Sequence, residues 1–233
     1  MKTIFALLAA VAWPLLSCSH PFLTERLTKQ TASAAVDQPS QALKQLLDVA
    51  VQEAAKKLSA PDGYFKNQAI KILLPPEAKD VEKTLRQLGM GKLVDDAILS
   101  MNRAAEDAAK QAVPVFADAI KKMTLTDVQQ IVSGTPDAAT QFLKKATYSQ
   151  LKTRYTPIVD QALKKSQATK YWKDIFTRYN KIPGVKKVNP NLSEHVVTKA
   201  LDGFFQQLAQ EEKKIRQNPE ATANELIRWL FGK

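Results

Sequence analysis

The sequence of 233 residues contains one cysteine, two histidines and seven glycines. A single cysteine excludes an internal disulfide framework and any zinc or iron–sulfur site that needs several cysteines. Two histidines leave little for a histidine-rich metal site. Glycine is scarce, and no hairpin dipeptide lies between alternating segments, which argues against a β-sheet protein. We therefore expect no metal and no cofactor.

Hydrophobic residues are abundant, at 45%, and basic residues outnumber acidic ones by 34 to 23, for a net charge of +11. So large an apolar share is typical of a folded chain and not of a disordered one. The excess of lysine and arginine predicts attraction to anionic partners.

The N-terminus is typical of an export signal. Lys2 precedes an apolar run over residues 4–13, which is too short to span a bilayer as a mature helix. The run is followed by Leu15-Leu16-Ser17-Cys18, which resembles a bacterial lipobox. The resemblance implies a signal peptide over residues 1–17 and a lipid on Cys18, and Ser19 resembles an outer-membrane sorting residue. The alternative is an ordinary secretory signal, which would give a soluble periplasmic protein.

Residues 18–39 are mostly small and polar, and we interpret them as a tether. From residue 40 the apolar residues recur at helical spacing, so we predict a single all-α domain of about ten helices over residues 40–233. Predicted helix starts include caps at Ser40, Thr126 and Ser193. A short helix and then an extended crossing are expected over residues 64–74, and helix breaks near Ala146 and Pro157.

Several motifs resemble a bacterial family known only as domain of unknown function 4197. They are Pro61-Asp62-Gly63-Tyr64-Phe65, residues 69–72, 91–96 and 102–106, Tyr171-Trp172, and pieces of residues 179–203. The resemblance covers about residues 40–231 and implies an exported, helical bacterial protein. It implies no activity, and no functional residue can be transferred from it.

One predicted helix carries a polar face. Asp95, Asn102 and Glu106 lie at i, i+7 and i+11, with Asp96 and Arg103 beside them. Paired carboxylates can perform acid–base chemistry or bind a divalent cation. The favoured alternative is a solvated face, or internal pairing with Arg103 or Lys92.

The irregular stretch over residues 179–191 is the best candidate for ligand binding, with Tyr179, Asn180, Lys186, Lys187 and Asn189 as the candidate residues. The favoured alternative is that Asn180, Asn189 and Asn191 are only turn and cap residues. His195, in the first turn of the next helix, is interpreted as a surface residue.

Six Lys-Lys doublets carry much of the positive charge: Lys56-Lys57, Lys121-Lys122, Lys144-Lys145, Lys164-Lys165, Lys186-Lys187 and Lys213-Lys214. Most are expected near helix C-termini, where cations interact favourably with the helix dipole. They would also attract anionic lipid, lipopolysaccharide or acidic polymers, at about 1 kcal/mol per basic residue near an anionic surface. The favoured alternative to a specific anionic site is that the doublets are solvated helix ends that aid solubility. Nucleic acid is a poorer partner, since no recognised nucleic-acid motif is present.

These features favour a non-enzymatic, lipid-anchored envelope protein whose helical domain contacts anionic envelope components. An alternative is a helical carrier with an apolar cavity lined by Phe204 and Phe205, although their helical spacing favours a place in the core. A hydrolase that uses Asp95, Asp96 or Glu106 is the least favoured function. The oligomeric state is not determined by any of these patterns.

Overall fold

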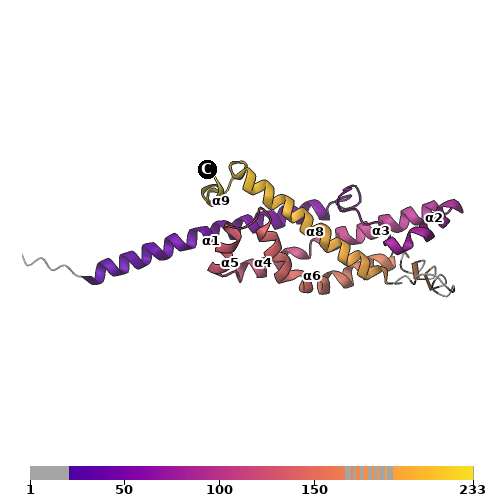
Figure 1. Cartoon of the computed structure of the whole chain (residues 1–233), viewed down its shortest axis with the longest axis horizontal. Helices are drawn as coiled ribbons and strands as arrows, with labels where there is room; N and C mark the ends of the chain where they lie inside the picture. The colour runs from indigo at the N-terminus through magenta and orange to yellow at the C-terminus, as the bar shows by residue number, and fades with distance from the viewer. Residues whose placement is uncertain are drawn as a thin grey trace, which may run out of the picture. The chain divides into compact units, whose positions relative to one another are not determined.

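The computed structural model describes residues 21–165, 169, 172–173, 176–177, 180, 183, 187 and 191–232, with side chains described from residue 38 onward. The chain divides into two units, Met1–Asp37 and Gln38–Lys233, and the packing described below belongs to the second. Within the described residues there are helices and turns but no strand (Figure 1), so the all-α prediction is confirmed. The signal peptide and Cys18 lie outside the described residues.

The elements follow one another along the chain as α-helices joined by turns, with two short 3₁₀ helices. They are α1 (Pro21–Ser59), η1 (Pro76–Ala78), α2 (Lys79–Gln87), α3 (Gly91–Ala109), α4 (Ala112–Lys121), α5 (Leu125–Val132), α6 (Ala138–Lys165), α8 (Leu192–Gln217), η2 (Pro219–Ala221) and α9 (Glu225–Phe231).

Helix α1 begins earlier than predicted. It starts at Pro21, so Ser40 lies inside the helix and the predicted cap at Ser40 is wrong. The part of the predicted tether that is described, residues 21–39, is helical. This stretch contains Glu, Arg, Lys, Gln and Ala, which are good helix formers, and composition alone did not reveal the helix.

Two other helix starts differ by one or two residues from the prediction. Thr124, and not Thr126, caps α5, and it forms a capping box with Asp127. Asn191, and not Ser193, caps α8, where its side chain accepts the backbone N–H of Glu194. Several residues near each start have suitable side chains, and the cap is the one whose oxygen reaches the unpaired N–H of the first turn.

Helix α6 runs without a break through Ala146 and Pro157, where breaks were predicted. The doublet Lys144-Lys145 therefore lies inside a helix and not at its C-terminus. The same face stays buried along the whole of α6, and this packing outweighs the local cost of proline. Its buried residues include Leu143, Leu151, Tyr155, Val159 and Leu163.

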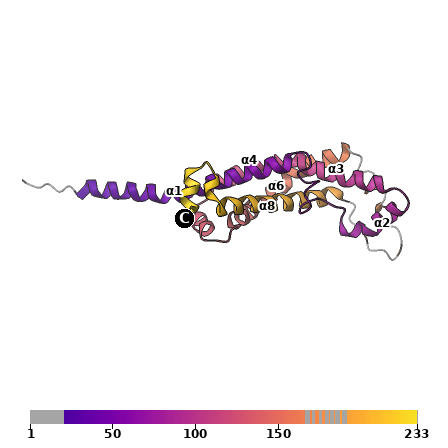
Figure 2. The ribbon, with the colours of Figure 1, turned by 90° about the horizontal axis from the view of Figure 1, so that it is seen from above.

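The core is formed mainly by α3, α4, α6 and α8 together with the part of α1 from residue 43 onward. Figures 1 and 2 both show α8 running beside α6 and α3. At the centre of the core, the ring centroid of Phe116 lies 5.4 Å from that of Phe204 and 5.7 Å from that of Phe205. Such tilted and edge-on contacts are typical of core aromatics, so the core interpretation of Phe204 and Phe205 is the one the packing supports.

A buried carboxylate on α8 holds the start of α6. Glu212 is fully buried and accepts the backbone N–H groups of Ala139 and Thr140, at 3.1 and 2.8 Å, and the Thr140 hydroxyl. It also pairs with Arg216. A negative charge at a helix N-terminus is stabilising, so Glu212 acts as a cap supplied by another helix. Sequence patterns did not identify this residue.

The connection from α1 to η1, residues 60–75, is a series of turns followed by an extended segment. The predicted extended crossing is confirmed over residues 71–75, but the short helix predicted before it is wrong. At Asp62 the backbone φ is +67°, in the left-handed region. Side chains of α3 bind backbone groups of this connection, which removes the need for a helical ladder.

Helix α8 approaches this connection closely at Gly203. A Cβ atom there would lie 2.8 Å from Cε1 of Tyr64 and 3.1 Å from Cβ of Ile70. The hydroxyl of Tyr64, which is buried, donates to the carbonyl of Ala200 one turn earlier, at 2.8 Å. Only glycine at position 203 allows this approach without displacement of the loop.

The substitution Gly203→Ala is therefore expected to lower the free energy of unfolding by about 1–3 kcal/mol, as overpacking does. Without a clash, alanine in a helix would instead be stabilising by about 1 kcal/mol. Gly91→Ala is the matched control, because a Cβ there meets nothing closer than 3.6 Å. Urea unfolding of both variants measures the difference. A Gly203→Ala variant as stable as Gly91→Ala would contradict the close approach.

Candidate functional site

The extended segment over residues 71–75 is fixed to α3 by Asn102. The amide oxygen of this buried side chain accepts the backbone N–H of Ile72 at 2.9 Å. Its amide nitrogen donates to the carbonyls of Ile72 and Ile98, at 2.8 and 2.7 Å. Both backbone groups of Ile72 are thus satisfied by one side chain, as a neighbouring strand would satisfy them.

The turn before this segment is fixed by Glu106 and Arg103. Glu106 is 4% exposed, and its Oε1 accepts the backbone N–H groups of Tyr64 and Phe65 at 3.1 and 3.3 Å. Its Oε2 accepts from Arg103 at 2.6 Å, and Arg103 also donates to Asp62 at 2.7 Å. Hydrogen bonds from Lys66 and Arg103 lower the pKa of Asp62. The carboxylate of Glu106 is thus fully engaged in holding the loop.

The other two carboxylates of the predicted polar face do not join this cluster. Asp95 pairs with Arg86 at 2.8 Å and Asp96 pairs with Lys92 at 2.7 Å, both at exposed positions. All five residues of the predicted face therefore have partners within the protein. No group of three or more His, Cys, Asp or Glu side chains that could hold a metal occurs in the described part of the chain.

Most of the predicted binding stretch over residues 179–191 lies outside the described residues, and this includes Tyr179, Lys186 and Asn189. Of the remaining two candidates, Asn180 donates its backbone N–H to the carbonyl of Phe176 at 2.9 Å, and Lys187 is exposed. The prediction of a binding loop here stays a prediction.

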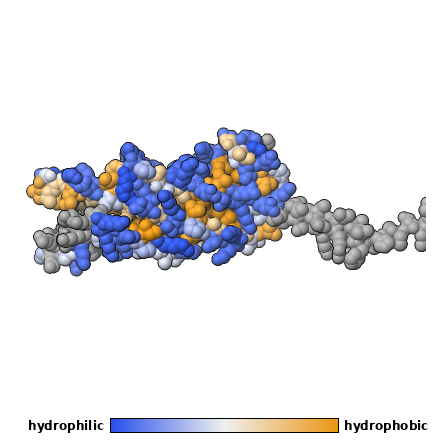
Figure 3. Space-filling view, turned by 180° about the vertical axis from the view of Figure 1, so that it is seen from behind, coloured by the Kyte–Doolittle hydropathy of each residue, from blue (hydrophilic) through white to orange (hydrophobic). Residues whose placement is uncertain are grey.

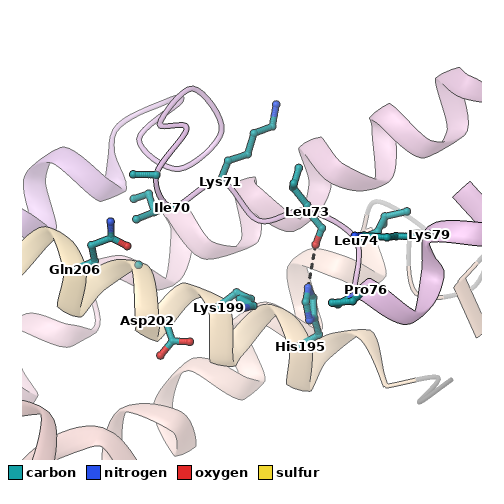
Figure 4. A pocket seen from close by; sticks show the side chains of 12 residues that line it. Ile70, Lys71, Leu73, Leu74, Pro76, Lys79, His195, Lys199, Asp202 and Gln206 are labelled. Carbon is teal, nitrogen blue, oxygen red and sulfur yellow. Dashed lines mark hydrogen bonds between the residues drawn. The ribbon is translucent and has the colours of Figure 1, made fainter.

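A groove of about 380 Å³ lies between residues 69–79 and helix α8. The first wall is the extended segment that Asn102 fixes, together with the start of α2. The second wall is one face of α8, which carries His195, Lys199, Asp202 and Gln206 at spacings of four, three and four residues. In Figure 4 the ring of His195 points to the segment from Ile70 to Pro76, whereas the carboxylate of Asp202 points away from it.

His195 joins the two walls. Its Nε2 lies 2.9 Å from the carbonyl oxygen of Leu73, and the side chain is half-buried, where a surface position was predicted (Figure 4). In the neutral ring Nε2–H is then the donor. Burial lowers the pKa of His195, and Lys199 acts in the same direction, which outweighs the opposite effects of the hydrogen bond to Leu73 and of the Glu77 carboxylate. The ring is therefore held in its neutral form near pH 7.

The lysines of the groove differ in their surroundings. The ammonium of Lys71 lies 4.2 Å above the ring of Phe65, and the side chain extends away from α8 in Figure 4. Lys79 and Lys199 are exposed and form no ion pair with a described residue. The one acid in the lining, Asp202, lies 3.7 Å from Lys144 of α6. The groove therefore carries a net positive charge.

The groove also has an apolar part. Side chains alternate along the extended segment, so Ile72 is 1% exposed whereas Leu73 is 57% exposed. Asn102 and His195 fix the backbone on either side of this alternation. Leu73 therefore stays exposed because its backbone is fixed, and its side chain points away from α8 while its carbonyl faces His195 (Figure 4). Ile70, Leu74 and Pro76 are the other apolar residues of the groove lining.

The model of a family described as "Protein of unknown function (DUF4197)" matches residues 33–232. The chain belongs to this family. No curated protein and no solved structure matches the chain. Several motif residues that carried the resemblance, Tyr64, Asn102, Arg103, Glu106 and Gly203, hold the loop between α3 and α8. These motif residues are thus accounted for by the fold.

The sequence analysis did not predict the groove, although one of its two walls can be identified from the sequence alone. The spacing of His195, Lys199, Asp202 and Gln206 defines a polar face of α8 without reference to any structure. The opposite wall is about 120 residues earlier in the chain, and only the tertiary fold brings it near. None of the helices in the described part of the chain has the length and apolar content that a membrane span needs.

Replacement of Asn102 is expected to be strongly destabilising. Asn102→Ala leaves the buried N–H and carbonyl of Ile72 without partners, which costs about 2–4 kcal/mol of unfolding free energy. Asp96→Ala, which removes an exposed ion pair on the same helix, should cost less than about 1 kcal/mol. Urea unfolding tests both, and equal losses would contradict the role of Asn102.

His195 is expected to make stability depend on pH. Because its pKa in the folded state is lower than about 6.5, the unfolded state takes up the proton first as the pH falls. Stability is then complete above the unfolded pKa and decreases as the pH falls towards the folded pKa. Unfolding midpoints measured from pH 8 to 5 should show this decrease in the wild type and a smaller one in His195→Gln. Equal slopes would contradict the effect of burial.

Proposed function

We propose that this protein is a non-enzymatic, lipid-anchored protein of the bacterial envelope whose helical domain binds an anionic envelope component. The observation that carries the proposal is the groove, where Lys79 and Lys199 have no described carboxylate partner and lie beside exposed apolar side chains. An anionic group would pair with these two lysines without a rearrangement of the protein, since the lysines are already at the surface.

The rest of the surface also supports binding to an anionic envelope component. Hydrophilic residues cover much of the face shown in Figure 3. Of the described lysine doublets, Lys57 pairs with Glu211 and Lys144 lies near Asp202, whereas Lys121-Lys122 and Lys213-Lys214 have no ion pair with a described residue. A protein of net charge +11 is drawn toward anionic surfaces.

The lipid anchor and the basic domain would act together. The lipobox-like sequence that ends at Cys18 would hold the chain at a membrane, and the domain would then meet anionic head groups at high local concentration. The outer membrane facing the periplasm is the proposed location, on the basis of Ser19 after Cys18.

The two alternative functions have less support. A hydrolase needs carboxylates that converge on a substrate, whereas Glu106 binds two backbone N–H groups, and Asp95 and Asp96 form exposed ion pairs. A carrier that uses Phe204 and Phe205 would need a cavity beside rings that pack against Phe116.

The binding half of the proposal is tested with vesicles. The full chain carrying Cys18→Ser, which cannot receive a lipid, should bind phosphatidylglycerol-containing vesicles at least about tenfold more tightly than phosphatidylcholine vesicles. Raising the salt from about 0.1 to 1 M shortens the Debye length from about 10 to 3 Å and should remove this difference. The phosphatidylcholine baseline accounts for any binding by the apolar N-terminal run.

Equal binding to both vesicle types at low salt would refute the anionic partner. The anchor half is tested in cells by labelling with radioactive palmitate. Label is expected in the wild type and absent from Cys18→Ala, and label retained in Cys18→Ala would refute the anchor.

A further inference from the structure

The C-terminal helix α9 exposes a tryptophan to solvent. Five of its seven residues are apolar, but only Ile227 is buried. Trp229 follows two residues later and is 56% exposed. Because successive residues of a helix are about 100° apart, Trp229 lies nearly opposite Ile227. A single exposed apolar side chain is common on protein surfaces, so the place of this one in the fold decides whether it has a role.

Contacts at both ends of α9 fix its orientation. The side chain of Asn224 caps the helix, where it accepts two backbone N–H groups at 3.0 and 3.2 Å. The amide nitrogen of Asn224 also donates to Oε1 of Gln45 on α1, at 2.6 Å. At the other end, the guanidinium of Arg216 lies 4.8 Å from the ring centroid of Phe231. The helix cannot rotate Trp229 inward without losing these contacts.

Helix α9 lies at the end of the domain where the chain enters. Gln45 follows residue 38, the first of the second unit, by about two turns of α1. Figures 1 and 2 both show α9 beside α1, and α2 at the opposite end of the domain. The chain arrives at this end from the direction of Cys18, the residue of the proposed anchor.

The surroundings of α9 are compatible with anionic lipid. Lys213 and Lys214, near the end of α8, are exposed and form no ion pair with a described residue. The exposed acids of the same stretch are Glu220 and Glu225. Charge alone therefore gives little attraction here. The indole ring is the more specific feature, because tryptophan is enriched where the polar and apolar layers of a bilayer meet.

The available area distinguishes a membrane from a second copy of the chain. A stable contact between two proteins buries about 800 Å² on each partner. A tryptophan buries at most about 250 Å², and Trp229 is the one large apolar side chain that α9 exposes. A bilayer needs less area, because the proposed anchor would already hold the domain at a high local concentration of lipid.

From these observations we infer that Trp229 inserts into the head-group region of an anionic bilayer. Helix α9 and the end of the domain where the chain enters then face the membrane that holds the anchor. This inference rests on the proposed function, because it requires a membrane-bound chain and anionic lipid, and it adds a membrane contact outside the groove.

The test uses the fluorescence of Trp229 in the full chain carrying Cys18→Ser, Trp13→Phe and Trp172→Phe, which leaves one tryptophan. The Nε1 of Trp172 has no hydrogen-bond partner, so Trp172→Phe removes no hydrogen bond. Vesicles that contain phosphatidylglycerol should shift the emission to shorter wavelength, and lipids brominated near the head group should quench it. Unchanged emission on vesicles that have bound the chain would overturn the inference.

A tryptophan at the opposite end of the domain is the matched control. Leu88, in the turn between α2 and α3, is 69% exposed. With Leu88→Trp and Trp229→Phe added to the same chain, the emission should not shift on the vesicles. Equal shifts from the two positions would contradict an orientation with α9 towards the membrane.

Binding measurements give a second readout. Trp229→Ala should weaken binding to the phosphatidylglycerol vesicles by about tenfold, because the buried indole surface is lost. Leu88→Ala removes a side chain of similar exposure and should have little effect. Thermal unfolding of each variant confirms that it is folded, which is expected because both side chains are exposed.

The outcomes separate this inference from the proposed function. If the vesicles bind the chain but the emission of Trp229 does not change, the inference is wrong and the anionic partner remains. If the emission shifts with protein concentration in the absence of vesicles, a second copy covers Trp229 and the inference is wrong. If the vesicles do not bind the chain at low salt, both proposals fail.

Discussion

The hydrogen bonds between Asn102 and Ile72 are the constraint on which the rest of this structure depends. Residues 60–75 make no helix and no sheet, so their buried backbone groups need partners from elsewhere. Asn102 and Glu106, one turn apart on α3, supply them. Because one helix binds both the turn and the extended segment, the loop has a fixed position against the core.

The groove is a consequence of that fixed loop. Side chains alternate in direction along the extended segment over residues 71–75, so Ile72 is buried and Leu73 is exposed to solvent. The hydrogen bond from His195 fixes the distance between this segment and α8. The same hydrogen bonds that stabilise the fold therefore also shape the groove.

Buried acids have structural roles throughout this basic protein. Glu106 binds the loop, Glu211 pairs with Lys57 of α1, and Glu212 caps α6. Each accepts hydrogen bonds from at least two donors, which is how a buried charge is tolerated. Of the carboxylates considered for catalysis, Glu106 thus has a structural role, whereas Asp95 and Asp96 form exposed ion pairs.

The sequence by itself determined the all-α class, most of the helical faces, the turn after α1 and the stop at Gly89, because these depend on local periodicity and backbone preference. It did not determine the continuity of α6 through Pro157, the cap that Glu212 supplies, or the groove. Those features join residues far apart in the chain, such as Leu73 and His195. Only tertiary packing decides which distant side chain forms a hydrogen bond with a given backbone group, and local sequence patterns do not predict it.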